Sequence, residues 1–456
     1  MNAVRSILII VALTAQSLAA AEAKPVSFYQ EVIPIFKKSC TGCHHPGKLK
    51  GELDLTTFAS LTKGGKHGPA LKAGDAKGSE LLEQVSGAEP SMPKEGDPLS
   101  KDEIAVLEKW ISQGAHDDTP AEALHPDRLS KPPEYLAPPV ISALAFSPDG
   151  KILAVSGYHE VILHHPDGSG PIARLVGESP RIESITFSPD GKLIGVAGGA
   201  PSRFGEIQIW DAASHQQLHS YKVATDSLYG ASFSPDGERL AFGCADKSVR
   251  VIAVASGKEL LKFDNHSDWV FGTTFSLDGK KLLSGSRDKA LKLINAADGQ
   301  FIDDINKLLE GVLCLARSPK EDLVIYGGDQ GTPRIYRISD NQNRGAGDTA
   351  RDANLVKELE RQPGAVRSVA YSADGAMVAV SGSPGEVRVY KPDGTKLGVL
   401  KGMEGYTFAL AFSPRKNELF AGGFDGQVRI FDPATGKEIR NFLPVPLQPG
   451  AKVAAK

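Results

Sequence analysis

The stretch ALAFSPDGKILAVSG, residues 143–157, decides the fold, because similar stretches return at regular intervals along the chain. Each copy predicts two short strands joined by a Ser-Pro-Asp-Gly turn, since alternating apolar residues flank residues that favour turns. The serine of the turn stands in seven copies at Ser147, Ser188, Ser234, Ser276, Ser318, Ser372 and Ser413. The intervals run from 41 to 54 residues. A period of roughly 40 to 45 residues with several short strands per unit is typical of a propeller blade.

The seven copies predict an all-β, seven-bladed propeller over residues 140–443. A third strand follows each pair, as in EIQIWD and QVRIFD, and KEIRNFL at 437–443 is expected to supply the last outer strand. The spacing and the Ser-Pro-Asp-Gly turns resemble the WD-repeat family, although only Trp210-Asp211 is a literal Trp-Asp pair. The longest interval leaves a polar extra loop at about 339–353. A closed ring removes the exposed sheet edges that favour aggregation.

The region before the propeller is organised differently. Residues 24–118 predict a small helical domain, with a first helix at about 27–38 and a last helix that begins at a capping box of Ser100 and Glu103. This last helix is expected to carry one apolar stripe of Ile104, Leu107 and Ile111, flanked by Val106 and Trp110. Residues 119–139 are rich in proline and predict a semi-rigid linker. Residues 444–456 are expected to form a flexible tail.

The first residues, 1–23, have the pattern of a secretory signal: a basic start, a short apolar stretch and small residues at the cleavage site. We therefore expect an exported, soluble protein in the periplasm or another extracytoplasmic space. No later segment is apolar enough to predict a membrane span in the mature chain. The formal net charge of -3 gives no electrostatic reason to expect nucleic acid as a partner.

The run CTGCHH at residues 40–45 holds two of the four cysteines of the chain. Structural zinc usually requires four ligands, and the other two cysteines lie far away in the propeller region. A thioredoxin-like dithiol requires a βαβ context, which the surrounding sequence lacks. Two cysteines at this spacing with a following histidine are the attachment signal for haem c. The pattern favours covalent haem bound through Cys40 and Cys43, with His44 as the proximal axial ligand.

Met92 is the expected second axial ligand of the iron. It is the only methionine of the mature haem region and lies between Pro90 and Pro93 in a polar loop. Methionine opposite histidine raises the reduction potential and fills the sixth position, which suits electron transfer. His67 and His116 are the alternative ligands.

Residues 28–116 resemble the planctomycete-type cytochrome c domain, through CTGCHHPGKLKGELDL, GGKHGPALKAGDAKGSELL and SMPKEGDPLSKDEIAVLEKWISQGA. The resemblance implies one covalently attached haem c per chain, with thioethers at Cys40 and Cys43, His44 proximal and Met92 distal. One departure is Met-Pro-Lys, where the family often has a second proline. The expected fold is a small all-α cytochrome c domain followed by the all-β seven-bladed WD-repeat propeller.

Other groups of polar residues have structural interpretations. His266, Ser284 and Asp288 have the residue types of a hydrolase triad but also occupy positions where WD blades hold structural hydrogen bonds, which we favour. His164 and His165 are expected at the surface. Cys244 and Cys314 are expected to be unpaired and buried in strands.

These features together predict a monohaem electron carrier whose propeller docks a protein partner. Seven lysines between positions 37 and 72 form a basic collar that would steer an acidic redox partner. One alternative is an oxidoreductase in which the haem feeds a catalytic site in the propeller. Another is a binding scaffold in which the haem senses redox state. The sequence assigns no catalytic residue.

Overall fold

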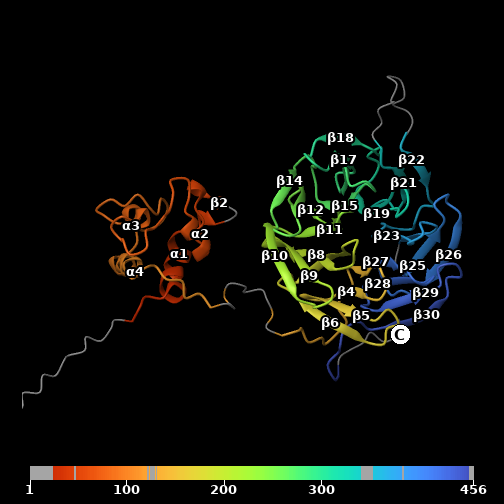
Figure 1. The fold of residues 1–456 in the computed structure, drawn as a ribbon, viewed down its shortest axis with the longest axis horizontal. Helices are drawn as coiled ribbons and strands as arrows, with labels where there is room; N and C mark the ends of the chain where they lie inside the picture. The colour runs from red at the N-terminus through yellow and green to blue at the C-terminus, as the bar shows by residue number, and fades with distance from the viewer. Residues whose placement is uncertain are drawn as a thin grey trace, which may run out of the picture. The chain divides into compact units, whose positions relative to one another are not determined.

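The computed structural model divides the chain into two compact units, Met1–Leu124 and His125–Lys456 (Figure 1). It describes residues 24–45, 48–120, 123, 129, 131–339, 353–382 and 385–450. The predicted signal segment 1–23, nearly all of the predicted loop 339–353 and the end of the predicted tail lie outside the described residues.

The first unit is mainly helical, with one short antiparallel strand pair (Figure 1). Its elements are η1 (Phe28–Val32), α1 (Ile33–Ser39), β1 (His44–His45), β2 (Lys48–Leu49), η2 (Lys50–Glu52), α2 (Phe58–Lys63), α3 (Glu80–Val85) and α4 (Lys101–Ser112). The helix expected at 27–38 is thus present as a π-helical turn, η1, followed by α1. Pro34 explains the change, because its nitrogen has no hydrogen to donate within a continuous α-helix.

Aromatic rings pack together in the core of this unit. The rings of Phe28 and Trp110 stack with centroids 5.2 Å apart, and Phe58 meets Phe28 edge-on. The apolar stripe predicted for the last helix is confirmed, because Leu107, Trp110 and Ile111 of α4 are all buried. The predicted capping box at the start of α4 is also confirmed.

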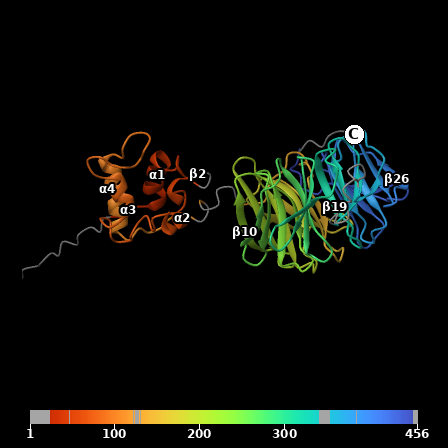
Figure 2. The ribbon, with the colours of Figure 1, turned by 90° about the horizontal axis from the view of Figure 1, so that it is seen from above.

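The second unit is a seven-bladed β-propeller in which every blade is a four-stranded antiparallel sheet of consecutive strands (Figures 1 and 2). The first four blades are β3 (Leu144–Phe146), β4 (Leu153–Ser156), β5 (Glu160–His164), β6 (Pro171–Val176); β7 (Arg181–Phe187), β8 (Leu193–Ala200), β9 (Phe204–Asp211), β10 (Gln217–Ala224); β11 (Leu228–Phe233), β12 (Arg239–Cys244), β13 (Val249–Ala253), β14 (Glu259–Phe263); β15 (Val270–Phe275), β16 (Lys281–Ser286), β17 (Leu291–Asn295), β18 (Phe301–Asp304). The last three blades are β19 (Val312–Arg317), β20 (Leu323–Gly328), β21 (Arg334–Arg337), β22 (Leu355–Glu358); β23 (Ser368–Tyr371), β24 (Val378–Ser381), β25 (Glu386–Tyr390), β26 (Lys396–Lys401); β27 (Thr407–Phe412), β28 (Leu419–Gly423), β29 (Val428–Phe431), β30 (Glu438–Phe442). The predicted seven-bladed architecture is confirmed, and β30 is the outer strand expected from KEIRNFL.

The Ser-Pro-Asp-Gly turns have the same internal hydrogen bond in several blades. The Ser147 hydroxyl donates to Asp149 at 2.7 Å, and the Ser188 hydroxyl donates to Asp190 at 2.6 Å. Gly150 has a φ of 65°, which glycine adopts without strain. The repeated sequence therefore encodes the turn between the first two strands of a blade.

Segments on either side of the blades close the ring without exchanging a strand. The amide of Ile141, just before β3, donates to the carbonyl of Gly423 in the last blade at 2.9 Å. Tyr135 and Leu447 form a parallel bridge. The expected surface position of His164 is wrong: it is 2% exposed, and its Nε2 lies 2.8 Å from the carbonyl oxygen of Pro444. The chain after β30 covers the imidazole of His164, and the local pattern of residues around His164 does not predict this contact.

In the described part of the chain, no helix combines the length and the apolar character needed to cross a membrane.

Candidate haem site

The turn after α1 places three of the predicted site residues together. The amide of Cys40 donates to the carbonyl of Phe36 at 2.8 Å, which ends the helix. The amides of Cys43 and His44 then donate to the carbonyl of Cys40 at 3.1 and 3.2 Å. The buried side chain of Phe36 anchors this end of α1 in the core. Both thiols and the imidazole thus belong to one hydrogen-bonded turn.

The residues after the turn fix the backbone of His44. It pairs with Leu49 across the β1–β2 ladder, and its carbonyl accepts from the amide of Leu55 at 3.0 Å. The Nδ1 atom of His44 is buried and has no hydrogen-bond partner in the described part of the chain. Buried polar atoms normally have a partner, so an external group is expected at this imidazole.

Met92 reaches the same core as Cys40. Both side chains are partly buried and pack against the hydrophobic cluster that contains Phe28 and Trp110. The Met92 amide donates to the carbonyl of Gln84, in α3, at 2.8 Å. No local pattern predicts this anchoring role of Gln84. The structure thus brings a cysteine of the attachment motif and the predicted distal ligand to the rim of one core.

The alternative ligands are less well placed. His67 lies exposed in the turn between Gly65 and Gly68, and His116 is exposed after α4. The carbonyl of His116 accepts from Nε1 of the core residue Trp110 at 3.0 Å, but the exposed position of His116, like that of His67, differs from the partly buried positions of Cys40 and Met92. Met92 remains the preferred distal ligand.

The chemistry of Cys40 differs from that of a redox dithiol. Burial raises the pKa of its thiol to about 11, and the negative charge of Glu103 adds to the effect. Reactive dithiols instead have a lowered cysteine pKa. Cys40, Cys43, Cys244 and Cys314 are all free thiols. Within the described ranges, no group of three or more His, Cys, Asp or Glu side chains is arranged to hold a metal ion. Two free thiols, a buried imidazole nitrogen and a thioether sulfur match the donors that haem c requires.

An ion pair joins the two helices beside the motif. Nζ of Lys38, in α1, lies 2.8 Å from Oε1 of Glu103, in the first turn of α4. Glu103 also accepts from the amide and the hydroxyl of Ser100, each at 2.8 Å. The hydrogen bond from Lys38, followed by those from Ser100, lowers the pKa of Glu103 to about 2. The sequence identified Glu103 as a capping residue, but its pairing with Lys38 depends on the tertiary fold.

The basic collar consists of seven exposed side chains, those of Lys37, Lys38, Lys48, Lys50, Lys63, Lys66 and Lys72. Lys37 and Lys38 also line a shallow hollow along η1 and α1, together with Tyr29 and Ile33. Lys38 is paired with Glu103, and the other six lysines of the collar are exposed to a partner.

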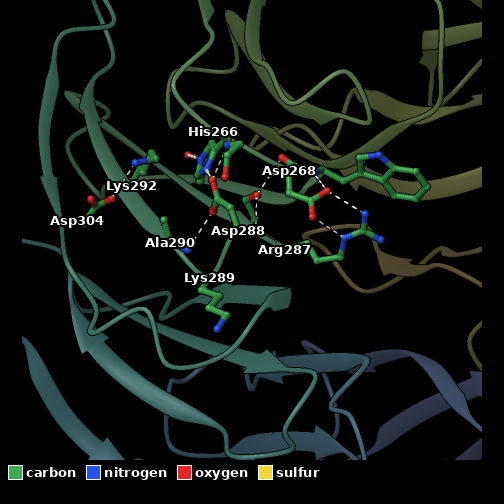
Figure 3. A network of polar contacts seen from close by, with 12 residues as sticks. His266, Asp268, Arg287, Asp288, Lys289, Ala290, Lys292 and Asp304 are labelled. Atoms are coloured by element: carbon green, nitrogen blue, oxygen red, sulfur yellow. Dashed lines mark hydrogen bonds and ion pairs between the residues drawn. The ribbon is translucent and has the colours of Figure 1, made fainter.

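In the fourth blade, His266 joins Ser284 and Asp288, and Figure 3 shows the contact of His266 with Asp288. Its Nδ1 lies 2.8 Å from Asp288 Oδ2, and its Nε2 lies 2.8 Å from Ser284 Oγ. Burial alone would raise the pKa of Asp288, but the hydrogen bond from His266 holds it at about 2. Ser284 is fully buried. The three residues tie a loop to its blade, as predicted, rather than present a nucleophile to solvent.

The sequence comparisons identify both regions. Residues 40–96 match the family model for planctomycete cytochrome c. This confirms the resemblance over a shorter range than the predicted 28–116, and the matched range includes Cys40, Cys43, His44 and Met92. Residues 180–393 match the N-terminal domain model of nucleolar protein 10-like proteins, and residues 394–432 match the WD domain, G-beta repeat.

Relatives of known name match a part of the chain. The F-box-like/WD repeat-containing protein TBL1X of Mus musculus is 26% identical over 138 residues, covering 29% of this chain and 25% of that protein. WD repeat-containing protein 1 of Rattus norvegicus is 32% identical over 132 residues, covering 28% of this chain and 20% of that protein. The chain therefore spans about a quarter or less of the length of these relatives.

Among solved structures, the computationally designed Ika8 protein is similar in fold. The TM-score is 0.51 at 21% sequence identity, over 68% of this chain and 90% of that one. This likeness concerns the fold alone.

Proposed function

We propose that the protein is an exported c-type cytochrome that carries single electrons, with its propeller as a docking platform for a protein partner. The observation that carries the proposal is the placement of Cys40, Cys43 and His44 in one turn, with Met92 on the core that Cys40 borders. The family match over residues 40–96 supports it.

Cys40 and Cys43 would hold one haem c through thioether bonds, and His44 and Met92 would be the axial ligands of its iron. Bound in this way, the group supplies reversible one-electron chemistry at a raised potential. The chain itself positions the ligands: the end of α1 orients the two thiols and His44, while the bond to Gln84 holds the Met92 backbone. The adjacent apolar core limits the access of water.

The basic collar is the feature that favours an acidic protein as the redox partner. Opposite charges steer encounter and are screened by salt. Electron exchange with an acidic partner should therefore slow as ionic strength rises, while exchange with a neutral small-molecule reductant should not.

Export is part of the same proposal and rests on the pattern of residues 1–23. Haem c is attached outside the cytoplasm, so the two expectations agree. Cell fractionation tests the location: recovery of the haem-bearing chain in the cytoplasm, with residues 1–23 intact, would contradict it.

A redox titration followed by visible absorption tests the carrier function. We expect one c-type chromophore per chain that is reduced and reoxidised in a single one-electron step. A second chromophore, or a multi-electron transition, would favour the oxidoreductase alternative.

A further inference from the structure

The propeller has a central channel with a cavity of about 490 Å³. Its wall is formed by the first strand of every blade: β3, β7, β11, β15, β19, β23 and β27. These strands are neighbours around the ring (Figure 1). A cavity of this size falls within the range that small ligands or inserted side chains occupy.

Hydrogen bonds between blades make the wall rigid. The hydroxyl of Ser184, in β7, accepts from the amide of Ala231, in β11, at 3.1 Å. The hydroxyl of Thr273, in β15, donates to the carbonyl of Gly230 at 2.7 Å. A Cβ atom on Gly230 would lie 2.4 Å from the Cα of Gly272, so glycine permits this close approach of two strands.

Glu183, in β7, is the acidic side chain on this wall. It makes no hydrogen bond and no ion pair with any described residue. Burial raises its pKa, and the charge of Arg181 on the same strand offsets this only in part. A partly buried carboxylate without a partner is costly, and a cation that enters the channel would relieve this cost.

Aromatic rings lie next along the wall. Tyr229, in β11, meets Phe271, in β15, edge-on with centroids 5.1 Å apart. Tyr229 also stacks with Trp269, with centroids 6.3 Å apart. Trp269 is 36% exposed and already holds the guanidinium of Arg287 at 4.8 Å from its ring centroid. Aromatic faces beside a carboxylate are the surroundings that ammonium and guanidinium groups prefer.

The basic residue of the wall lies on a different blade. Arg367 directly precedes β23 in the sixth blade, whereas Glu183 belongs to the second blade. The basic group whose charge acts on Glu183 is Arg181, not Arg367. Arg367 therefore does not neutralise Glu183, which leaves the carboxylate side of the channel negative and aromatic.

We propose that this channel binds a lysine or arginine side chain of a partner protein, which pairs with Glu183 and packs against Tyr229 and Phe271. The inference rests on the proposed docking role of the propeller and gives the chemistry of the partner. The occupant is a basic peptide segment, because the charge of Glu183 is complementary to it and the exposed ring of Trp269 stacks on Tyr229 of the wall.

A displayed library of random 12-residue peptides, selected against the full haem-bearing chain, tests the proposal. We expect the selected peptides to share a lysine or arginine. Its replacement by norleucine or citrulline should weaken binding by roughly 10- to 150-fold, the range for a lost hydrogen bond to a charged group. Glu183→Gln should weaken the original peptides to a similar degree.

Glu238→Gln is the matched control, because Glu238 is exposed in the turn after β11, at the other end of the inner strands. It should leave binding unchanged.

Tyr229→Phe retains the ring and should bind nearly as well as the unmodified chain, whereas Phe271→Leu should bind more weakly. The proposal would be overturned if Glu183→Gln bound the selected peptides as well as the unmodified chain does. It would also be overturned if the selected peptides were acidic and depended on Arg367, or if no peptide were selected. Electron exchange by the haem domain would be unaffected by any of these outcomes, so they are distinct from a failure of the proposed carrier function.

Discussion

Two of the four proposed haem-binding residues differ in how the chain holds them. His44 is fixed on both sides by backbone hydrogen bonds, and its Nδ1 is buried. Met92 lies in a loop between prolines and is fixed mainly through its own amide, which donates to Gln84. A flexible thioether side chain on a fixed backbone suits a ligand that must meet the iron at one position.

Met92→Ala should open the sixth coordination site and lower the midpoint potential, because the thioether ligand raises it. The shift should be a measurable fraction of the roughly 0.8 V range that axial ligands span. Visible spectra and a redox titration measure both effects. Met403→Ala is the control, since Met403 is also partly buried but packs in the propeller. An unchanged spectrum and potential in Met92→Ala would refute ligation.

Glu183→Gln should stabilise the propeller above the raised pKa of Glu183. A carboxyl whose folded pKa exceeds its unfolded value lowers stability as pH rises from the unfolded pKa through the folded one. The glutamine variant should therefore show a higher free energy of unfolding at pH 7 than the unmodified chain, and the difference should vanish at pH 3. Urea unfolding at the two pH values measures it, with Glu238→Gln as the control. A loss of stability at pH 7 would show that Glu183 has a structural partner.

At the scale of elements, the contact between α1 and α4 links the attachment motif to the rest of its domain. Lys38 lies two positions before Cys40, and Glu103 lies in the first turn of the helix that carries Trp110. The ion pair is open to solvent on the side of Lys38, whose side chain is 69% exposed, and is therefore weak. Its effect should be to fix the end of α1 rather than to supply much stability.

Glu103→Gln tests this contact through its pH dependence. The pKa of Glu103 is lowered from 4.5 to about 2, so its contribution to stability is present above 4.5 and is lost as pH falls through about 2. The variant should be less stable than the unmodified chain at pH 7, and the two should converge near pH 2. Acid unfolding followed by far-ultraviolet circular dichroism measures the difference. Glu108→Gln, an exposed change on the same helix, should have no effect, and equal losses in both variants would contradict the assignment.

The elements show which features a single sequence could predict. The capping box of Ser100 and Glu103, the stripe of α4 and the Ser-Pro-Asp-Gly turns depend on residues close in the chain, and each was predicted correctly. The π-helical turn of η1, the burial of His164 and the pairing of Glu103 with Lys38 were not predicted. The burial of His164 and the pairing of Glu103 with Lys38 depend on contacts between distant residues, which the local pattern does not contain. The π-helical turn follows from Pro34, a local feature that the expected single helix at 27–38 did not take into account. The ligand roles of His44 and Met92 remain predictions.

At the scale of the whole molecule, the propeller closes through the segments that flank its blades. All four strands of the last blade come from the end of the chain, so no strand is exchanged between the first and last blades. The first and last blades share a hydrophobic cluster, and the flanking segments add the bridge between Tyr135 and Leu447, the contact of His164 with Pro444 and the buried side chain of Val445. The hydroxyl of Tyr135 also donates to Glu160 at 2.7 Å.

Deletion of residues 444–456 should therefore lower the free energy of unfolding of the propeller by about 2 to 4 kcal/mol, from the loss of one or two buried aliphatic side chains. Denaturant unfolding measures the change, while the haem absorption should remain unaltered. Deletion of residues 451–456 alone is the control and should have little effect. Equal stability of both truncated chains would show that the blades close the ring by themselves.

Acid–acetone extraction of the chain, produced in a host that attaches haem c, tests the central claim most directly. We expect one haem per chain that stays with the protein, and we expect Cys40→Ala with Cys43→Ala to abolish this retention. A colourless chain, or a pigment that passes into the solvent from the unmodified protein, would contradict the account.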